Sequence, residues 1–196
     1  QILSGDVDRF RFRARAGQRL VLSANARRLM PYLADAVPGW FQATLQLFDP
    51  GGREVGYGYD YQLQPDPVIF YEAPADGEYT VAIRDSLHRG REDFVYRLNL
   101  GEWPVVTNAF PLGGRVGSPI AMELTGWNFG ATNVTVSFAT PGVQAWQPMS
   151  GPPGLNEQPC AVDTLAECVE QEPDDEPAGA QRLVTPVIVN GRIERP

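Results

Sequence analysis

Carboxylate side chains gather at two places in the sequence, and they are the first residues that could do chemistry. One place is the pair Asp6 and Asp8, which flanks a predicted turn at the entry to a strand. The other is the segment EQEPDD, whose carboxylates are Glu170, Glu172, Asp174 and Asp175. Calcium takes about six to eight oxygen ligands, mostly from carboxylates and backbone carbonyls. Both clusters are therefore candidate calcium ligands, and the alternative is an ordinary solvated acidic surface.

Two cysteines, Cys160 and Cys168, lie eight positions apart in the loop-like stretch PCAVDTLAEC. Two thiols and one distant histidine cannot fill the four positions of a zinc site. The spacing allows a short disulfide loop, which we expect if the protein is secreted and not if it stays in a reducing cytosol.

Three tyrosines, Tyr57, Tyr59 and Tyr61, alternate in the segment GYGYDYQ and so share one face of a predicted strand. Aromatic faces offer rigid contact area, so the row is a candidate ligand face for collagen-like chains or glycans. The alternative is packing within the core or at the edge of the sheet.

The sequence offers little for catalysis. The single histidine, His88, lies in the loop SLHRG, and Ser86 is too close along the chain to be aimed at a substrate with it. The sequence has no nucleophile elbow, zinc-protease motif or phosphate-binding glycine loop. All 16 basic residues are arginine, which excludes lysine chemistry. We expect a protein that is not an enzyme.

The segment DRFRFRARAG alternates arginines with apolar residues. The chain has 24 acidic and 16 basic residues, and its net charge of −8 does not favour a nucleic-acid partner. The alternation predicts a half-buried strand ended by a turn at Gly17. Its inward side chains would be Phe10, Phe12 and Ala14, and its solvated side chains Arg9, Arg11, Arg13 and Arg15.

The elements that position these residues read as short strands. The chain has 20 glycines and 18 prolines in 196 residues, and strand-like runs are separated by turns such as DPGG and PADG. We therefore predict an all-β fold, an antiparallel β-sandwich followed by a smaller β domain. The one helix-like piece, ARRLMPYLADA, is interrupted by Pro31. No apolar run reaches the roughly 18 residues of a membrane helix.

The first hundred residues resemble the bacterial pre-peptidase C-terminal domain family. The resemblance lies in SGDVDRFRFRARAGQRLVLS, LQLFDPGGREV and YEAPADGEYTVAIRDSLHRGREDFVYRLNLGE, and it covers residues 1–101. It implies a jelly-roll or immunoglobulin-like sandwich without catalytic activity. Such domains are accessory modules of secreted bacterial proteases and large surface proteins, and the family includes collagen-binding modules.

The rest of the chain divides into three predicted parts. Residues 102–150, with the turn TGWNFG, resemble an immunoglobulin-like module of the IPT/TIG type, and residues 151–169 read as a disulfide-bearing linker. Residues 170–196 resemble the start of another pre-peptidase C-terminal domain, which would continue with the GDVD element that stands near the start of this chain. The resemblance implies one period of a repeat, in which the acidic segment and the GDVD aspartates hold calcium together.

The tail carries a predicted strand. Its β-forming residues are Val184, Val187, Val189 and Ile193, and Pro186 suits an edge position. A sandwich that begins at GDVD leaves an open edge, which invites such a strand. The tail would either fold back on its own chain or complete the next copy by donor strand complementation.

These features predict a non-enzymatic extracellular structural protein, a repeat unit of a bacterial surface protein or filament whose partners are copies of itself. One alternative is an accessory module of a secreted hydrolase that adheres to collagen, polysaccharide or cell wall. Another is a processing or chaperone-like appendage of a protease. Calcium is the only cofactor expected.

Overall fold

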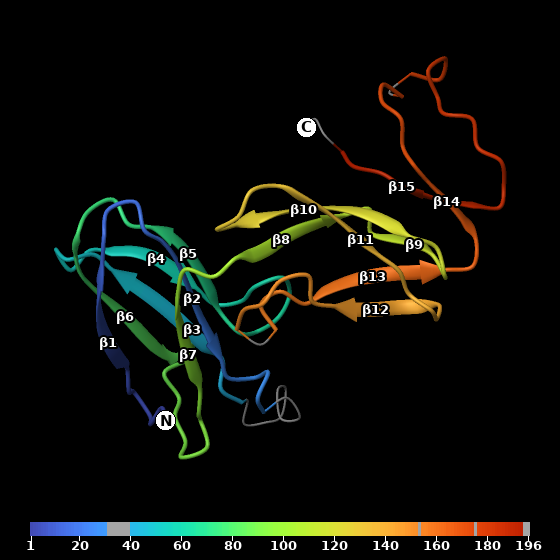
Figure 1. Cartoon of the computed structure of the whole chain (residues 1–196). Helices are drawn as coiled ribbons and strands as arrows, with labels where there is room; N and C mark the ends of the chain where they lie inside the picture. Colours follow the sequence, from blue (N-terminus) through green and yellow to red (C-terminus); the bar gives the residue numbers. More distant parts are fainter. Residues whose placement is uncertain (31–39, 153, 175, 194–196) are drawn as a thin grey trace. The chain divides into compact units, whose positions relative to one another are not determined.

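The computed structural model describes residues 1–30, 40–152, 154–174 and 176–193. These residues form fifteen β-strands and no helix, which confirms the predicted all-β class (Figure 1). The chain divides into two compact units, Gln1–Trp103 and Pro104–Pro196. The predicted helix-like piece around Pro31 lies mostly outside the described residues.

Unit 1 is an antiparallel sandwich of two sheets. The strand order is β1-β6-β3-β4 in the larger sheet and β5-β2-β7 in the smaller one, and every pairing is antiparallel. Its strands are β1 (Asp8–Ala14), β2 (Arg19–Asn25), β3 (Ala43–Phe48), β4 (Glu54–Gly58), β5 (Val68–Glu72), β6 (Gly77–Asp85) and β7 (Arg97–Gly101).

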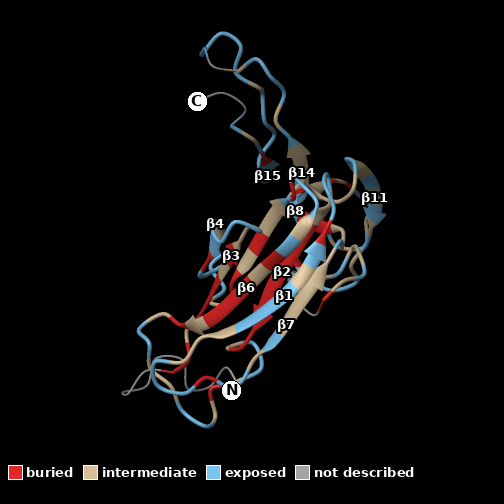
Figure 2. Ribbon diagram, turned by 90° about the vertical axis from the view of Figure 1, so that its left-hand side faces the viewer, coloured by how far each residue is buried: buried red, intermediate tan, exposed pale blue. Residues whose placement is uncertain are grey.

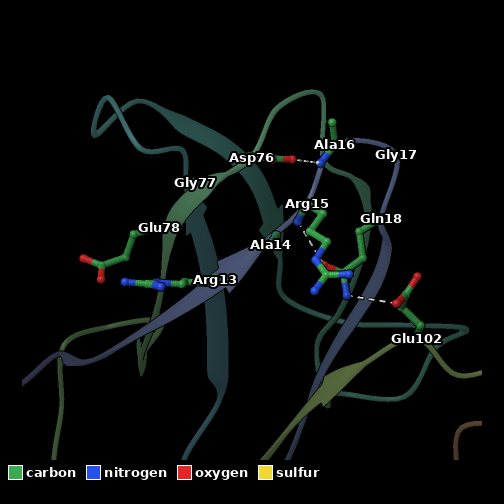
Figure 3. A pocket seen from close by; sticks show the side chains of 10 residues that line it. All are labelled: Arg13, Ala14, Arg15, Ala16, Gly17, Gln18, Asp76, Gly77, Glu78 and Glu102. Atoms are coloured by element: carbon green, nitrogen blue, oxygen red, sulfur yellow. Dashed lines mark hydrogen bonds between the residues drawn. The ribbon is translucent and has the colours of Figure 1, made fainter.

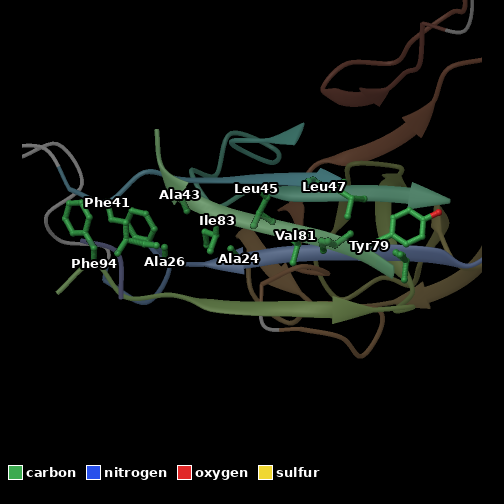
Figure 4. Packing of buried hydrophobic residues seen from close by; sticks show 14 of the residues in the cluster. Ala24, Ala26, Phe41, Ala43, Leu45, Leu47, Tyr79, Val81, Ile83 and Phe94 are labelled. Atoms are coloured by element: carbon green, nitrogen blue, oxygen red, sulfur yellow. The ribbon is translucent and has the colours of Figure 1, made fainter. Parts of the chain in front are cut away.

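Alternation along the strands builds the core of unit 1. On β6, Tyr79, Val81 and Ile83 point inward and are fully buried, and they meet Leu45 and Leu47 from β3 (Figure 4). At the other end of the core, Phe41 and Phe94 stack with ring centroids 5.2 Å apart. Each fully buried side chain of this size stabilises the fold by about 1.5–3 kcal/mol.

A buried carboxylate fixes the end of β6. Asp85 is fully buried and accepts hydrogen bonds from the backbone N–H groups of Gln42, Leu87 and Arg89 at 3.0 Å each. The Arg89 guanidinium pairs with it at 3.0 Å and also donates to the Trp40 carbonyl at 2.8 Å. Burial alone would raise the pKa of Asp85, but these donors hold it below its usual value.

The first residues of the chain are fixed to the loop before β7. Ile2 is fully buried, and its backbone exchanges hydrogen bonds with Phe94 and Arg91 at 2.9 and 3.0 Å. Gly90 lets the two segments approach, because a Cβ there would lie 1.8 Å from the carbonyl carbon of Leu3. The entry to β1 is therefore held by the core of unit 1.

Unit 2 has three small sheets, with strand orders β11-β10-β8, β12-β13-β9 and β14-β15. The β13–β9 and β14–β15 pairs are parallel. The strands are β8 (Val105–Phe110), β9 (Gly113–Arg115), β10 (Ile120–Trp127), β11 (Thr132–Val136), β12 (Gly142–Trp146), β13 (Gln158–Asp163), β14 (Ala166–Val169) and β15 (Val187–Asn190).

The core of unit 2 is small and is completed by buried amides. Val106, Met122 and Leu124 are fully buried at its centre. Asn156, also fully buried, accepts from the Val106 N–H at 2.8 Å and donates to the Pro104 carbonyl at 2.8 Å. Gln158 donates to the Val106 carbonyl at 3.2 Å. Side-chain amides thus hold the start of β8.

Residues 151–169 are not the linker that their prolines and glycines suggested. They form β13 and β14, and β13 lies between β12 and β9. Along β13, Gln158, Cys160 and Val162 are buried while Pro159 and Ala161 are exposed. This alternation is the strand signal that the flanking turn residues obscured. Figure 2 shows the contrast with β14, β15 and the loop that joins them, which are mostly exposed or half-buried.

Candidate interaction site

The free edge of β1 is the main candidate for interaction in unit 1. Since β4 contacts β5, the strands β1 and β7 bound the opposite side of the sandwich, and among the described residues β1 pairs only with β6. Phe10 was expected to point into the core, but it is 44% exposed because no strand covers that edge. Partly buried apolar side chains nearby pack against the core: Phe12, Tyr96, Leu98 and Leu100.

A hydrogen bond joins the two edge regions. The Tyr96 hydroxyl, just before β7, donates to the carboxylate of Asp8 on β1 at 2.5 Å. Burial, and then the bond to Asp8, raises the pKa of Tyr96 well above its usual value. Asp8 therefore has a structural partner in unit 1.

The outer face of β1 carries what we term the arginine row, Arg9, Arg11 and Arg13, which is exposed as the alternation predicted. These residues lie opposite Ala82, Thr80 and Glu78 of β6. Arg11 approaches Glu78 at 3.5 Å, and both side chains are more than half exposed. Among the described residues, the guanidinium groups of Arg9 and Arg13 have no hydrogen-bond or ion-pair partner.

The turn after β1 is lined by charges that already hold the backbone (Figure 3). Asp76 accepts from the Ala16 N–H at 2.7 Å. Gln18 accepts from the Arg15 N–H at 3.1 Å and donates to Glu102 at 2.9 Å. These contacts fix the turn at Gly17, where φ is +78°. The side chains of Asp76, Gln18 and Glu102 in this hollow are therefore engaged in holding the turn.

The tail strand is paired within unit 2. In the structure β15 lies parallel to β14, with Val187 opposite Ala166 and Val189 opposite Cys168. Asn190 accepts from the Leu112 N–H at 3.0 Å and donates to Glu167 at 2.8 Å.

Arg192 makes further contacts between the tail and the rest of unit 2. Its guanidinium pairs with Glu123 at 2.8 Å and lies 3.9 Å from the ring centroid of Phe110. Of the predicted donor residues, Val184 and Ile193 are outside β15, 89% and 97% exposed.

The predicted calcium ligands do not form a metal cluster within the part of the chain that the structure describes, where no three His, Cys, Asp or Glu side chains gather suitably. Asp6 accepts from the Val7 N–H at 2.8 Å. Glu170 accepts from the Arg192 N–H, and Glu172 from the Asp174 N–H at 3.3 Å. Asp175 lies outside the described residues. Calcium binding stays a prediction.

The predicted disulfide is wrong for this structure, because both cysteines are free. Cys160 on β13 is fully buried in the core of unit 2, and burial raises the pKa of its thiol. Cys168 belongs to the separate β14–β15 sheet and lines a shallow hollow beside β9. The two strands hold the thiols in different sheets, whereas the sequence suggested a single loop.

The three tyrosines do not form one flat row. Tyr57 on β4 and Tyr59 are 48% and 53% exposed, with ring centroids 6.2 Å apart. Tyr61 instead packs edge-on against Phe70 at 5.6 Å, and burial raises its pKa. Of the predicted ligand face, an exposed pair of aromatic rings therefore remains, Tyr57 and Tyr59.

His88 lies in the loop after β6, with its Nε2 atom 3.2 Å from the Arg84 guanidinium. The Ser86 hydroxyl donates to the Gln42 side chain at 3.4 Å. In this structure, Arg84 is the partner of His88 and Gln42 is the partner of Ser86.

Comparison of the sequence with protein-family models and with curated proteins finds no match. Within the described residues, no helix has the length and apolar character needed to cross a membrane.

Proposed function

We propose that this chain is a non-enzymatic extracellular structural module, a repeat unit of a bacterial surface protein or filament, and that copies join head to tail through strand edges. The observation that carries the proposal is the free edge of β1. An unpaired strand presents a row of N–H and C=O groups, which is a template for another strand. The exposed Phe10 adds apolar area at the same edge.

The tail supplies the complementary edge. Among the described strands, β15 pairs only with β14, so its other edge is open. A two-stranded sheet is only marginally stable in water and gains from joining a larger one. Because Asn190 and Arg192 fix the tail to unit 2, we propose that the β14–β15 sheet stays intact and adds its β15 edge to β1 of another copy. This contact does not close on itself and so gives a linear assembly.

The resemblance to pre-peptidase C-terminal and IPT/TIG modules agrees with this proposal, as do the two successive all-β units. Calcium belongs to the proposal as a ligand shared between Asp6 and Asp8 of one copy and the acidic segment of the next. A calorimetric scan in excess calcium and in EDTA tests it: at a hundredfold excess over Kd, an ion bound only to the folded state adds about 2.7 kcal/mol. Identical scans would remove calcium from the account.

The assembly is tested by sedimentation of the whole chain over a concentration series. Phe10→Lys places a charge at the β1 edge, and we expect it to weaken association about tenfold or more. The matched control is Leu63→Lys, at a side chain that is 97% exposed in the same unit, and we expect no change there. A wild-type protein that stays monomeric up to about 1 mM, the range of a binding free energy near −4 kcal/mol, would contradict the proposal.

The second candidate function is adhesion to a glycan or collagen-like chain through Tyr57 and Tyr59. Their exposure and proximity favour it, because paired aromatic rings are common in such contacts. Binding to immobilised collagen and polysaccharides by wild type, Tyr57→Ala and Tyr59→Ala separates this function from assembly. Binding that is equal in all three proteins would exclude the tyrosine pair.

A further inference from the structure

The guanidinium groups of the arginine row are regularly spaced, and those of Arg9 and Arg13 have no partner in the described residues, so the row is a candidate site for carboxylates. Alternate residues on a strand lie about 6.6–6.8 Å apart on one face, so the three guanidinium groups form a regular line. Each offers donors in a fork that matches a carboxylate. The contact of Arg11 with Glu78 is long and exposed, and pairs of this kind contribute little.

The surface beside the row is shaped to receive a side chain. A shallow pocket of about 370 Å³ is lined by Arg9, Arg11, Phe48 and Thr80, and also by two acidic residues, Asp49 and Glu78. Phe48 and Thr80 face each other across β3 and β6 on the same outer face. Asp49 is held by the Arg53 guanidinium at 3.3 Å and by the backbone N–H groups of Gly51 and Arg53. An acidic segment would bind through Arg9 and would compete with Glu78 for Arg11, while Phe48 and Thr80 supply apolar and hydroxyl surface.

The chain carries an acidic segment of this kind in unit 2. The loop between β14 and β15 begins with the sequence EQEPDDEP, and no basic residue follows before Arg182. Its described carboxylates are half-buried or exposed: Glu170, Glu172, Asp174 and Glu176. Unit 1 contains 14 acidic and 12 basic residues, whereas unit 2 contains 10 and 4. Most of the net negative charge therefore belongs to unit 2.

We propose that the acidic segment of one copy, through its described carboxylates Glu170, Glu172, Asp174 and Glu176, binds the arginine row of the next copy. This inference rests on the proposed head-to-tail assembly, in which β15 adds to β1. The acidic segment is in the same loop as β15, so pairing of the strands would raise its effective concentration near the row. An external polyanion is a weaker candidate, because no strand pairing holds it beside the row.

Paired charge reversals test the contact. The row variant Arg9→Glu with Arg13→Glu changes two side chains that have no partner in the described structure. The segment variant Asp174→Arg with Glu176→Arg reverses the other side. We expect each variant to self-associate about tenfold or more weakly than wild type, and a mixture of the two to recover association. Arg97→Glu with Arg115→Glu is the matched control, since both are exposed, and should associate as wild type does.

Salt and calcium dependence complete the test. We expect wild-type association to weaken as salt rises, because exposed charges are screened. In EDTA we expect it to persist at reduced strength, since calcium shared with Asp6 and Asp8 is a separate contact from the arginine row. Association that needs calcium, or that is insensitive to both charge reversals, would overturn the arginine contact while leaving strand addition intact. Absence of association in the wild type as well would instead refute the proposed function. Heparin that binds wild type but not the row variant, with self-association equal in both, would assign the row to an external polyanion and overturn the inference.

Discussion

The two units are both all-β, but they are stabilised in different ways. Unit 1 buries seventeen apolar residues in one cluster, whereas the cluster of unit 2 has seven. Strands β11 and β12 have no fully buried residue, in contrast to β2, where six of seven are buried. Because apolar burial is the main favourable term in folding, unit 1 has the larger reserve of stability.

The difference in core size indicates which substitutions should destabilise each unit most. Unit 1 relies on packing between two sheets and adds two buried carboxylates, Asp85 and Asp66, which accept hydrogen bonds from backbone N–H groups. Unit 2 compensates for its small core with buried amides, Asn156, Gln158 and Asn190, each bonded to backbone or to a charge. A buried amide stabilises only when its partners are present, so unit 2 is sensitive to single polar substitutions. We expect the units to unfold separately, unit 2 first.

The largest effect should come from the aromatic end of unit 1. Phe41→Ala removes a fully buried ring that stacks on Phe94. We expect the free energy of unfolding of unit 1 to fall by about 3–5 kcal/mol. Hydrogen exchange resolved by segment should show faster exchange across β2, β3 and β6 with unit 2 unchanged. Equal loss of protection in both units would show that they unfold together and would contradict the separate stabilities argued above.

Asp85→Ala leaves backbone donors and the Arg89 guanidinium without their acceptor. We expect it to lower the free energy of unfolding of unit 1 by about 3–4 kcal/mol. Asp60→Ala, at an exposed carboxylate, is the control. The pKa of Asp85 is lowered by folding, so its contribution is present above the unfolded value near about 4 and is lost as pH falls below it. Wild type should therefore lose stability in acid more steeply than Asp85→Ala, as followed by urea titration at several pH values.

Local patterns in the sequence predicted much of unit 1. The alternation in DRFRFRARAG indicated a strand with solvated arginines, and the structure confirms this for Arg9, Arg11 and Arg13. Phe10 departs from the pattern because alternation tells which side of a strand a residue faces but not whether a neighbouring strand covers it.

Unit 2 was harder to predict, because its pairings are not local. The partner of β15 is β14, and β13 lies beside β9; both pairs are parallel and need long connections. Cysteine spacing could not reveal that Cys160 faces the core while Cys168 belongs to another sheet. The arginine row was visible in the sequence, but the lack of partners for Arg9 and Arg13 was not.

A substitution at Asn156 tests how much the buried amides stabilise unit 2, and we expect a smaller effect than at Phe41 or Asp85. Asn156→Ala leaves the Val106 N–H and the Pro104 carbonyl without their partner in a buried site, and we expect a loss of about 2–3 kcal/mol from unit 2 alone. Asn133→Ala, at an exposed position of β11, is the matched control. If the two variants unfold at the same urea concentration, water replaces the amide and unit 2 does not depend on it.

We expect the smallest change in stability for a substitution beside the free edge of β1 in unit 1. Tyr96→Phe keeps the ring but removes the hydrogen bond to Asp8, and a bond to a charged acceptor contributes about 1.5–3 kcal/mol. Since Tyr96 is partly exposed, we expect the lower end of that range. Tyr59→Phe, at an exposed ring, should be neutral.

The pH dependence of this bond separates it from simple packing. Folding raises the pKa of Tyr96, so its contribution is complete below the unfolded tyrosine value of about 10 and is lost as pH rises toward the folded value. The stability difference between wild type and Tyr96→Phe, measured by urea titration, should therefore be constant near neutral pH and shrink above about pH 10. A difference that persists unchanged in alkali would mean that the hydroxyl contributes through packing, and that the link between Asp8 and Tyr96 does not hold the free edge of β1 in place.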